Sequence, residues 1–502
     1  MRAWGRTSLA CAALLALACS NGGSGNGIPD GVVPCPDALA ALEAFGAIES
    51  VGDGTAASCT ETALRDALDI VTTTPGGGTI VFDCGGAAHV IALTSPLVAG
   101  GALLIDGGGL VTLSGGEATR VIELDNYAEL TLQHLVIRDG RAAESGAGVL
   151  HPWYGVLRAI DVRFENNACT SMVGELGGGA VFAGGLSEAV FSGCEFVGNS
   201  ASNGGAILNR GSTLTVVDCA FEGNAALGSG DGQFGNGGAL YIDGMNYDDP
   251  GDFFLCGTTF TDNRATQHGS AVFSYFYEGS TSHVDRCAFI GNNFDGSPSG
   301  GAGGFYHETG PLTLSDSLFS ANRSDQHAAG LFVGSGSSAL VVNCTFAGNV
   351  VPEVGAAIFS GTSPMEIQSS TFYGNDADYA PAIFNNNEAS IGLKNTLFAA
   401  NTTPNEYSAL ACTEPLIDRG GNVQWPQVKP GGGDDVPCVD GVLFADPLVQ
   451  ALADNGGPTQ TMALDPASPA VDHGVDCPPP DADQRGVVRT GACDTGAYEV
   501  LE

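Results

Sequence analysis

Three aspartates each stand three residues ahead of a repeated phenylalanine and could act as catalytic carboxylates. They are Asp161, Asp218 and Asp316. Glycoside hydrolysis needs two carboxyl groups about 5 to 9.5 Å apart, and these three belong to copies of the repeat that are not neighbours. His268 and His327 also occupy equivalent positions in two copies that are separated by one without histidine. A solvated outer face explains both patterns better than catalysis does, so we assign no catalytic residue.

A row of large apolar side chains suggests binding instead. The row directly follows an inward aliphatic position, and strand alternation places it on the opposite face. If it is exposed, it suits stacking on sugar rings or docking of a partner; if a strand kink or a loop covers it, it is further core. The row consists of Phe182, Leu208, Tyr241, Phe273, Tyr306, Phe332, Phe359 and Phe384. The candidate sugar- or partner-binding residues are Tyr241, Phe273, Tyr306, Phe332 and Phe359.

The charge and the ligand patterns limit the other partners. The chain carries 56 Asp plus Glu against 17 Lys plus Arg, a net charge of −39. Such a surface repels nucleic acid and anionic lipid. No CxxC motif or adjacent Cys/His pair favours zinc. Calcium is the weak alternative to no cofactor: residues 481–486 imitate the start of an EF-hand loop without its closing Glu, and residues 248–252 form an acidic loop.

A sequence repeat indicates which secondary structure carries these residues. Nine copies of Phe-x-x-Asn recur from Phe164 to Asn401 at separations of 25 to 39 residues, and most precede a Gly-Gly-Ala-aliphatic cluster. A period of this size is typical of a solenoid. The unit has no helical stripe and is too short for a strand plus a packed helix. The sequence therefore predicts an all-β coil, with its regular repeats over residues 160–410.

Each repeated residue type has an expected structural duty. Successive Phe rings should stack at the strand spacing of about 4.8 Å. The repeated Asn can adopt left-handed dihedrals at a corner, and its amide can bond backbone groups of adjacent coils. Four cysteines two residues before a repeat Phe should face inward as buried small hydrophobes. They are Cys194, Cys219, Cys287 and Cys344.

Other cysteines lie outside the repeat and are candidates for disulfides in an exported protein. We pair Cys59 with Cys84, Cys412 with Cys438, and Cys477 with Cys493. No partner is evident for Cys35, Cys169 or Cys256. The sequence alone leaves the pairing open.

The N-terminus has the features of an exported chain. Arg2 and Arg6 precede an apolar run over residues 9–18, which is far shorter than the about 20 residues of a membrane span. Residues 1–18 are thus predicted to be a signal peptide, followed by a flexible linker over residues 19–34. Thr60 can cap a short helix with one apolar face. That helix belongs to an N-terminal cap over residues 35–78, which shields the end of the core.

Three segments resemble known bacterial families. The alternation of Phe-x-x-Asn with Gly-Gly-Ala-aliphatic resembles the repeat of polymorphic outer-membrane proteins and related right-handed parallel β-helix proteins. The residues around Cys19 resemble a lipoprotein signal, although Ala16 and Leu17 depart from its usual order; an ordinary signal peptide cut near Ala18 is the alternative. By that resemblance, Cys19 is lipidated and Ser20 permits export to the outer membrane.

The C-terminal motifs resemble the choice-of-anchor Q domain, which ends bacterial surface β-helices. The usual downstream anchor is missing after Glu502. The motifs are Asp454-Asn455-Gly456-Gly457-Pro458-Thr459, Ser468-Pro469-Ala470-Val471-Asp472, Asp483-Gln484-Arg485-Gly486 and Cys493-Asp494-Thr495-Gly496-Ala497-Tyr498-Glu499.

Together these features predict a right-handed, single-stranded parallel β-helix over residues 79–410 with a choice-of-anchor Q-like cap over residues 411–502. The expected role is that of an exported outer-membrane lipoprotein, facing the cell surface or the periplasm, or of an extracellular protein. It would act as a non-catalytic, adhesin-like binding protein whose partner is a glycan or a cell-surface protein, anchored to the membrane only through its lipid. The alternative is a carbohydrate-active enzyme, a polysaccharide lyase or a glycoside hydrolase, on the same scaffold.

Overall fold

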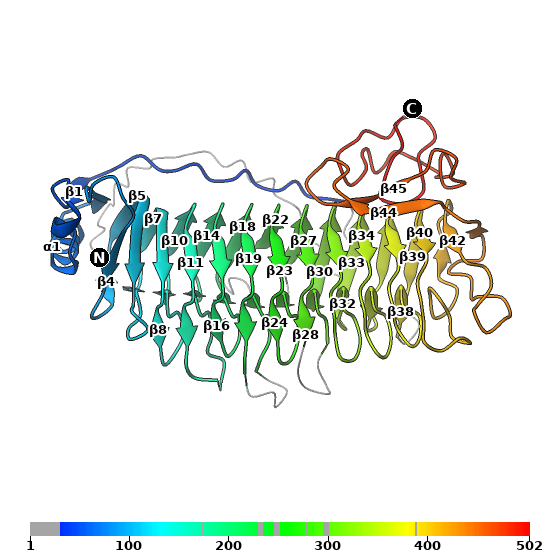
Figure 1. The fold of residues 1–502 in the computed structure, drawn as a ribbon, viewed down its shortest axis with the longest axis horizontal. Coiled ribbons are helices and arrows are strands. Elements are labelled where there is room, and N and C mark those ends of the chain that lie inside the picture. The colour runs from blue at the N-terminus through cyan, green and yellow to red at the C-terminus, as the bar shows by residue number, and fades with distance from the viewer. Residues whose placement is uncertain are drawn as a thin grey trace, which may run out of the picture.

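The chain winds into a right-handed parallel β-helix, as predicted (Figure 1). The computed structural model describes residues 31–172, 174–228, 234–244, 251–277, 279–294, 301–386 and 389–501. Cys19, the signal peptide and most of the linker therefore lie outside the described residues. The coils build sheets of 26, 11 and 6 strands, and one further pair of strands lies outside them. The prediction of an all-β architecture is confirmed.

One coil illustrates the unit. It contains β13 (Val181–Ala183), β14 (Glu188–Ser192), β15 (Glu195–Val197) and β16 (Ser200–Ala201), after which β17 (Ile207–Arg210) starts the next coil in register with β13. Strand β13 belongs to the 11-stranded sheet, whereas β14 and β15 belong to the 26-stranded sheet and β16 to the 6-stranded sheet. Each residue therefore pairs with its counterpart one coil away, so equivalent side chains form columns along the axis.

The repeated phenylalanines form the central column of the core. The nine rings from Phe164 to Phe398 are at most 1 % exposed, and consecutive ring centroids lie 4.4 to 5.1 Å apart with nearly parallel planes. This spacing is the distance between neighbouring strands, so the pairing of strands and the stacking of rings reinforce each other. The predicted stack of repeat rings is confirmed.

The repeated asparagines form a second buried column that satisfies the backbone at a corner. For example, Asn292 Oδ1 accepts from the backbone N–H and the side-chain amide of Asn263, and Asn292 Nδ2 donates to the carbonyl of Phe260. The residue before each such Asn has left-handed dihedrals, as at Asp262 (φ 53°) and Ala321 (φ 56°). The expectation that the Asn itself is left-handed is wrong, because its amide must point into the column.

The cysteine row is buried, and it also bonds to the backbone. Cys194, Cys219, Cys287 and Cys344 are free and at most 3 % exposed. The thiol of Cys219 accepts from the N–H of Cys194, and Thr258 Oγ1 accepts from the N–H of Cys219. Burial raises the pKa of the Cys287 thiol to about 12, so these groups are unreactive parts of the core.

The N-terminal end of the rod is covered by helix α1 (Glu61–Thr73), which packs Leu64, Leu68 and Val71 inward (Figure 1). Thr60 caps it by accepting from the N–H of Ala63, as predicted. Strand β1 (Ala47–Val51) pairs with β2 (Gly78–Phe82) to start the coil. The helix thus shields the first coil of the core from water.

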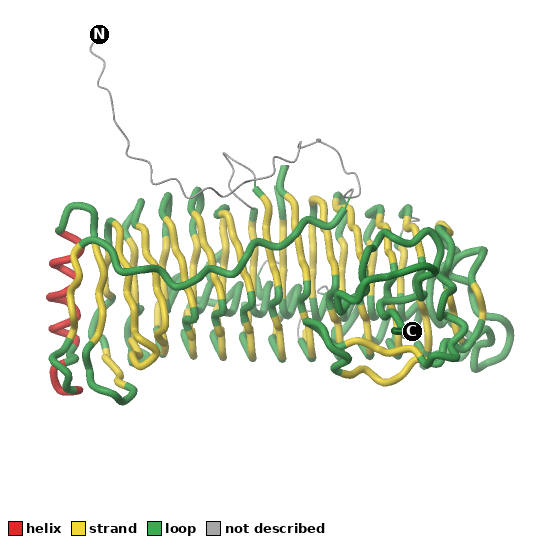
Figure 2. The backbone as a smooth tube through the Cα atoms, turned by 90° about the horizontal axis from the view of Figure 1, so that it is seen from above, coloured by secondary structure: helices red, strands yellow, loops and turns green. Residues whose placement is uncertain are grey.

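Residues 31–46, here called the strap, run extended along the outside of the coils toward α1 (Figure 2). A disulfide from Cys35 to Cys256 holds the strap to β22 (Asp252–Cys256). Further along, the N–H of Leu39 donates to Ser192 Oγ, and Gln133 exchanges two hydrogen bonds with the backbone of Leu42. The strap therefore fastens coils that are far apart in the sequence.

The end of the chain folds back onto the side of the rod. Strands β41 (Ile417–Asp418), β42 (Val423–Trp425) and β43 (Leu443–Phe444) continue the coil. Residues 445–501, here called the side module, then leave it with the antiparallel pair β44 (Val449–Ala453) and β45 (Thr461–Leu464) and lie against its outer surface (Figures 1 and 2). The structure also contains the disulfides Cys59–Cys84, Cys412–Cys438 and Cys477–Cys493, the three pairs proposed from the sequence.

Candidate functional site

The aromatic row forms a continuous ladder on the outer face of the 11-stranded sheet. Strands β21 (Leu240–Asp243), β25 (Val272–Tyr275) and β29 (Phe305–Glu308) place Tyr241, Phe273 and Tyr306 in one column. Phe332 and Phe359 continue it on β32 (Leu331–Val333) and β35 (Ile358–Ser360). The sequence therefore predicted the column correctly.

The rings of the ladder stack face to face along the column. Consecutive centroids from Tyr241 to Phe384 lie 4.2 to 5.3 Å apart, with interplanar angles of 6 to 22°. Phe273, Phe332 and Phe359 are each only 9 % exposed. The ladder thus presents ring edges and tyrosine hydroxyls to the outside, and its faces are not free to stack on a sugar.

Two histidines cover part of the ladder. The His268 ring lies 4.4 Å from that of Tyr306, and the His327 ring lies 4.7 Å from that of Phe359. Burial, with a smaller contribution from the neighbouring His327, lowers the pKa of His268 to about 4. Its Nδ1 accepts from the N–H of Gly301. Both histidines are thus packing groups of the ladder rather than a catalytic pair.

The N-terminal part of the ladder lines a cavity of about 440 Å³, here called the ladder hollow. Tyr241, Phe273 and Tyr306 contribute to it, whereas Phe332 and Phe359 lie outside it. Its lining is Glu175, Phe234, Asn236, Tyr241, His268, Phe273, Tyr275, Tyr306 and Glu308. Aromatic carbon with a few convergent polar groups is the usual composition of a small-molecule site.

Two carboxylates border the ladder hollow in different settings. Burial raises the pKa of Glu308, although a hydrogen bond from Tyr306 opposes the shift. Glu175 is exposed and forms an ion pair with Arg210. The hollow therefore offers one partly buried and one solvated carboxylate beside tyrosine hydroxyls.

Sequence reasoning missed the polar members of the hollow, although strand alternation could have found two of them. Tyr275 lies two residues after Phe273, and Glu308 lies two residues after Tyr306, so both share the outward face of the ladder. Asn236 stands directly before the small-residue cluster, as His268 does one coil further on, so the repeat also indicated its place. Glu175 and Phe234 come from segments between strands, for which no periodic signal exists.

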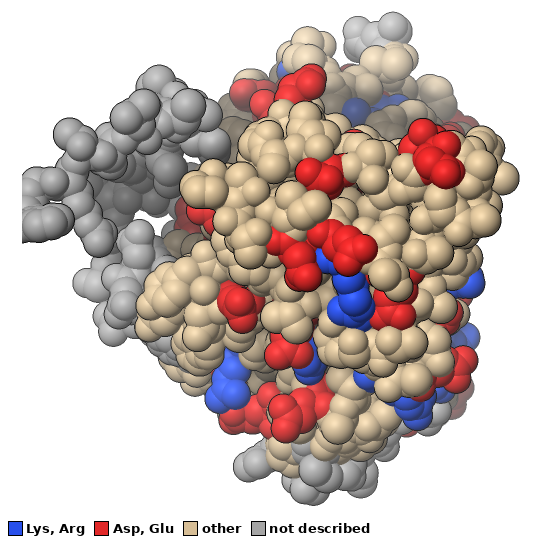
Figure 3. All heavy atoms as spheres, turned by 90° about the vertical axis from the view of Figure 1, so that its left-hand side faces the viewer, with Lys and Arg blue, Asp and Glu red and all other residues tan. Residues whose placement is uncertain are grey.

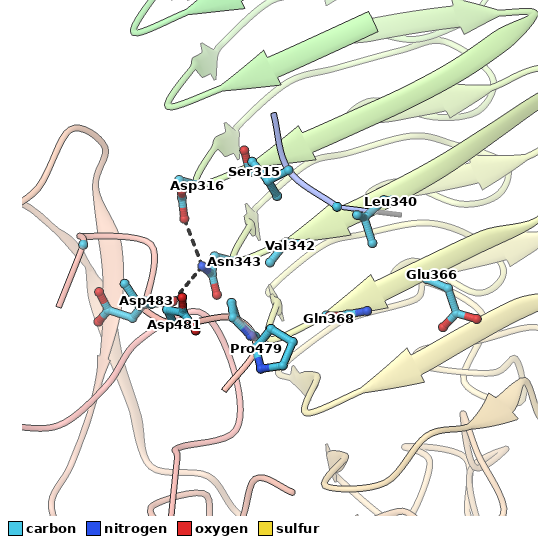
Figure 4. Close-up of a pocket in the computed structure, with 15 residues that line it drawn as sticks. Ser315, Asp316, Leu340, Val342, Asn343, Glu366, Gln368, Pro479, Asp481 and Asp483 are labelled. Carbon is cyan, nitrogen blue, oxygen red and sulfur yellow. Dashed lines mark hydrogen bonds between the residues drawn. The ribbon is translucent and has the colours of Figure 1, made fainter. Parts of the chain in front are cut away.

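A second cavity, of about 430 Å³, lies where the coils meet the side module and the start of the strap (Figure 4). We call it the junction cavity. Its lining includes Asp316, Asn343 and Glu366 from the coils, Asp481 and Asp483 from the side module, and Val32 from the strap. Its wall is richer in carboxylates than that of the ladder hollow.

Asp316 has the most altered carboxyl group at the junction. Burial and, to a lesser extent, the charge of Asp285 raise its pKa to about 7, although a hydrogen bond from Asn343 opposes the shift. Asn343 Nδ2 donates to both Asp316 Oδ1 and the carbonyl of Ala482 (Figure 4). Asp316 is therefore partly covered, unlike Asp161 and Asp218, which are exposed as expected.

Two other carboxylates of the junction cavity already hold structure together. Asp483 pairs with Arg485 at 2.7 Å, and Glu366 pairs with Arg419 at 2.8 Å. Gln484 donates to the carbonyl of Ser317 and accepts from Thr345 Oγ1, so it ties the side module to two coils. The junction cavity is thus built for attachment of the module.

The motifs that resemble choice-of-anchor Q sequences supply buried residues of this side module, above all over residues 493–499, whereas residues 454–458 lie mostly on its surface. Arg489 is 3 % exposed and pairs with Glu499 at 2.7 Å. The guanidinium of Arg485 lies 3.6 Å from the ring centre of Tyr498. Asp494 accepts from the N–H groups of Asp472 and Val500. These charged residues therefore stabilise the module rather than form an open site.

No model of a known protein family matches the chain, and no curated protein matches it significantly. The likeness to polymorphic outer-membrane proteins and to choice-of-anchor Q domains thus rests on the quoted residues alone. Four disulfides indicate an extracellular or periplasmic protein. Within the described residues, no helix is long and apolar enough to cross a membrane, and no group of three or more ligating side chains could hold a metal. The acidic loop at residues 248–250 lies outside the description.

Proposed function

We propose that the protein is an exported, non-catalytic binding protein that recognises a neutral or amino-sugar glycan in the ladder hollow. The observation that carries the proposal is the convergence of three tyrosines and two glutamates, Tyr241, Tyr275, Tyr306, Glu175 and Glu308, around one cavity of about 440 Å³. The cavity is large enough for a sugar residue on the scale of known ligand sites.

The chemistry of the lining suits a sugar. Sugar hydroxyls need acceptors and donors, which the carboxylates and the tyrosine hydroxyls supply. Sugar C–H groups need apolar carbon, which the ring edges of Phe273 and Tyr306 supply. Tyr275 is 37 % exposed and adds a ring at the rim. Such a site would bind a sugar through hydrogen bonds to its hydroxyls and through apolar contacts with its C–H groups.

Charge selects among glycans. The chain carries −39 charges and only two lysines, Lys394 and Lys429. Acidic side chains also predominate over basic ones at the N-terminal end of the rod (Figure 3). A polyanionic glycan would be repelled at long range. This balance disfavours a polysaccharide lyase, whose substrates are acidic polymers.

Export and anchoring complete the proposal. A signal over residues 1–18 and lipidation at Cys19 would tether the body through the Gly-rich linker, as in an outer-membrane lipoprotein. The resemblance of the side module to choice-of-anchor Q sequences supports a place at the bacterial surface. A surface-anchored rod with a glycan site would act as an adhesin-like protein.

A glycoside hydrolase is the second candidate, and one observation favours it. Burial keeps Glu308 protonated to a higher pH than an ordinary glutamate, which suits a general acid, and Glu175 lines the same hollow. In that case, neutral polysaccharides would release reducing ends, and Glu308→Gln would abolish the release.

A glycan array followed by titration calorimetry tests the proposal. We expect neutral or amino-sugar glycans to bind and polyuronates not to bind. Glu308→Gln should weaken binding about tenfold, because a hydrogen bond to a charged acceptor contributes about 1.5 kcal/mol. The matched control is Glu353→Gln, an exposed carboxylate facing His327 outside the hollow, which should bind like the wild type. Equal affinity of all three proteins, or no glycan bound at all, would contradict the proposal.

A further inference from the structure

Three aromatic side chains stand exposed on adjacent turns near the N-terminal end of the rod. Tyr127 lies between β6 (Ile122–Leu124) and β7 (Glu129–Arg138), and Trp153 and Tyr154 lie between β9 (Val149–His151) and β10 (Val156–Ile160). They are 70 %, 47 % and 46 % exposed. We call this group the turn platform.

The rings of the turn platform are ordered against one another. Tyr127 and Tyr154 stack at 5.0 Å with an interplanar angle of 10°, and Trp153 lies 6.2 Å from Tyr154. The Trp153 ring packs on Gly185, where a Cβ would clash with it. The platform is therefore a preformed surface, and binding to it requires little ordering of side chains.

One face of Tyr127 is available. Tyr154 covers the other face, and the corresponding turn of the preceding coil carries Gly100 and Gly101, which have no side chain to fill the space. Added Cβ atoms show the setting: at Gly101 nothing lies within 4 Å, and at Gly100 the nearest atom is a carboxylate oxygen of Asp125. An exposed ring face beside a carboxylate is what a sugar ring needs, since its C–H groups meet the ring and a hydroxyl donates to the carboxylate.

Both tyrosines are held in a conformation that their side chains disfavour. Their φ angles are 67° at Tyr127 and 59° at Tyr154, in the left-handed region. This region of backbone conformation favours glycine. At the same corner the next coil carries Leu186, which is also left-handed, and the coil after it carries Gly211. Glycine would thus serve the fold better than tyrosine at these turns.

The platform and the ladder hollow border the same corner of the coil. Tyr154 follows β9 at this corner, and Tyr275, in the lining of the hollow, ends β25 just before it. The free ring face belongs to Tyr127, one coil beyond Tyr154. Tyr127 and Tyr241 are therefore four coils apart, through β9, β13, β17 and β21, which corresponds to about 19 Å. An oligosaccharide of several residues can span that distance.

We propose that the turn platform is a second sugar-stacking site, and that the ligand is an oligosaccharide that reaches from the ladder hollow to Tyr127 and ends with a sugar ring on the free face of Tyr127. The proposal rests on the proposed function for its ligand class. It adds a prediction that the hollow alone does not make, namely that affinity rises with chain length, because the second contact becomes intramolecular.

The test uses the full chain and β-1,4-linked glucose and N-acetylglucosamine oligomers, from disaccharide to octasaccharide. Binding is followed by calorimetry and by Trp153 fluorescence in a Trp4→Phe, Trp425→Phe background. Tyr127→Gly should weaken binding of the long oligomers about fivefold, the worth of one aromatic contact of about 1 kcal/mol, and leave disaccharide affinity unchanged. Its melting temperature should hold or rise, because glycine relieves the strained φ. Leu186→Gly, at the same corner one coil further on, is the control and should bind like the wild type.

The possible outcomes separate the two proposals. A change in Trp153 emission with long oligomers only, together with the loss in Tyr127→Gly, supports the platform. Equal affinity of wild type and Tyr127→Gly for the long oligomers overturns it and leaves the hollow intact. A lower melting temperature of Tyr127→Gly with unchanged binding also overturns it, since the tyrosine would then be structural. Trp153 emission that responds while Glu308→Gln binds normally would overturn the hollow but keep the platform.

Discussion

The ladder hollow and the junction cavity have nearly equal volumes, about 440 and 430 Å³, and opposite characters. Two carboxylates of the junction cavity are bound to arginine, Asp483 to Arg485 and Glu366 to Arg419, and its described lining contains no aromatic ring. The ladder hollow is bordered by aromatic rings and by two carboxylates, of which Glu175 pairs with Arg210 and Glu308 accepts a hydrogen bond from Tyr306. Volume alone therefore does not identify a binding site; the aromatic lining distinguishes the two cavities.

Asp218 and Asp316, which occupy equivalent corners of two coils, also differ in their surroundings. Asp218 and Asp316 have the same left-handed backbone, with φ of 52° and 47°. Asp218 faces water, whereas Asp316 is partly covered beside the side module, and burial together with the charge of Asp285 raises its pKa to about 7. The coil determines the conformation of the residue, and what lies over it determines its chemistry.

The largest expected effect comes from breaking the attachment region. Arg489→Ala leaves the buried Glu499 carboxylate without its partner, which should lower the free energy of unfolding of the side module by about 3 to 5 kcal/mol. Denaturant unfolding measures the loss, and limited proteolysis should cut within residues 445–501. Glycan affinity should not change.

The control for this variant is Arg419→Ala. Its pair with Glu366 is solvent-exposed, so its removal should cost less than about 1 kcal/mol. Weaker glycan binding by Arg489→Ala would contradict the separation of the two cavities.

The next effect is a pH dependence confined to the junction. A carboxyl whose pKa is raised in the folded state keeps a proton that the unfolded chain has released. Its stabilising effect is present at low pH and is lost as the pH rises from about 4 to about 7. Asp316→Asn removes this loss, so the variant should exceed the wild type in stability by roughly 1 to 3 kcal/mol at pH 8, with little difference near pH 4.

Unfolding curves across this pH range measure the difference, and Asp218→Asn is the matched control, because asparagine also tolerates the left-handed backbone. Equal pH profiles for the two variants would show that the module does not alter Asp316.

The smallest expected effect comes from removing one hydroxyl group from the ladder hollow. Tyr306→Phe keeps the ring of the ladder and removes only the hydroxyl in the hollow. Glycan binding should weaken about fivefold, the worth of one neutral hydrogen bond. The melting temperature should fall slightly, because the partly buried Glu308 also loses the hydrogen bond from Tyr306. A stability loss without a binding loss would make the hydroxyl a structural group.

The part of the fold that the sequence predicts is the part that repeats locally. Strand alternation places Phe260 and Cys287 inward, and the spacing of the repeat brings Asn263 into register with the other asparagines. The Cys35–Cys256 bond did not follow, because the strap has no repeat and returns along the coils from a distant point. Cys256 ends its strand beside the inward Leu255, and this outward place was the one available signal.

The candidate site was predictable only in part, for the same reason. The ladder rings Tyr241, Phe273 and Tyr306 lie in a periodic row, but their mutual stacking and the cover by His268 depend on packing between coils and loops. The position of the side module, against the flank of the rod rather than its end, depends on single contacts such as Gln484 with Thr345. Such contacts leave no pattern in the sequence.

A crystal of the protein soaked with the best oligosaccharide from the array would show where the sugar binds. We expect a sugar residue in the ladder hollow, in contact with Tyr275, Tyr306 and Glu308, and none in the junction cavity. A sugar bound beside Asp316, or an empty hollow at saturating ligand, would contradict this expectation.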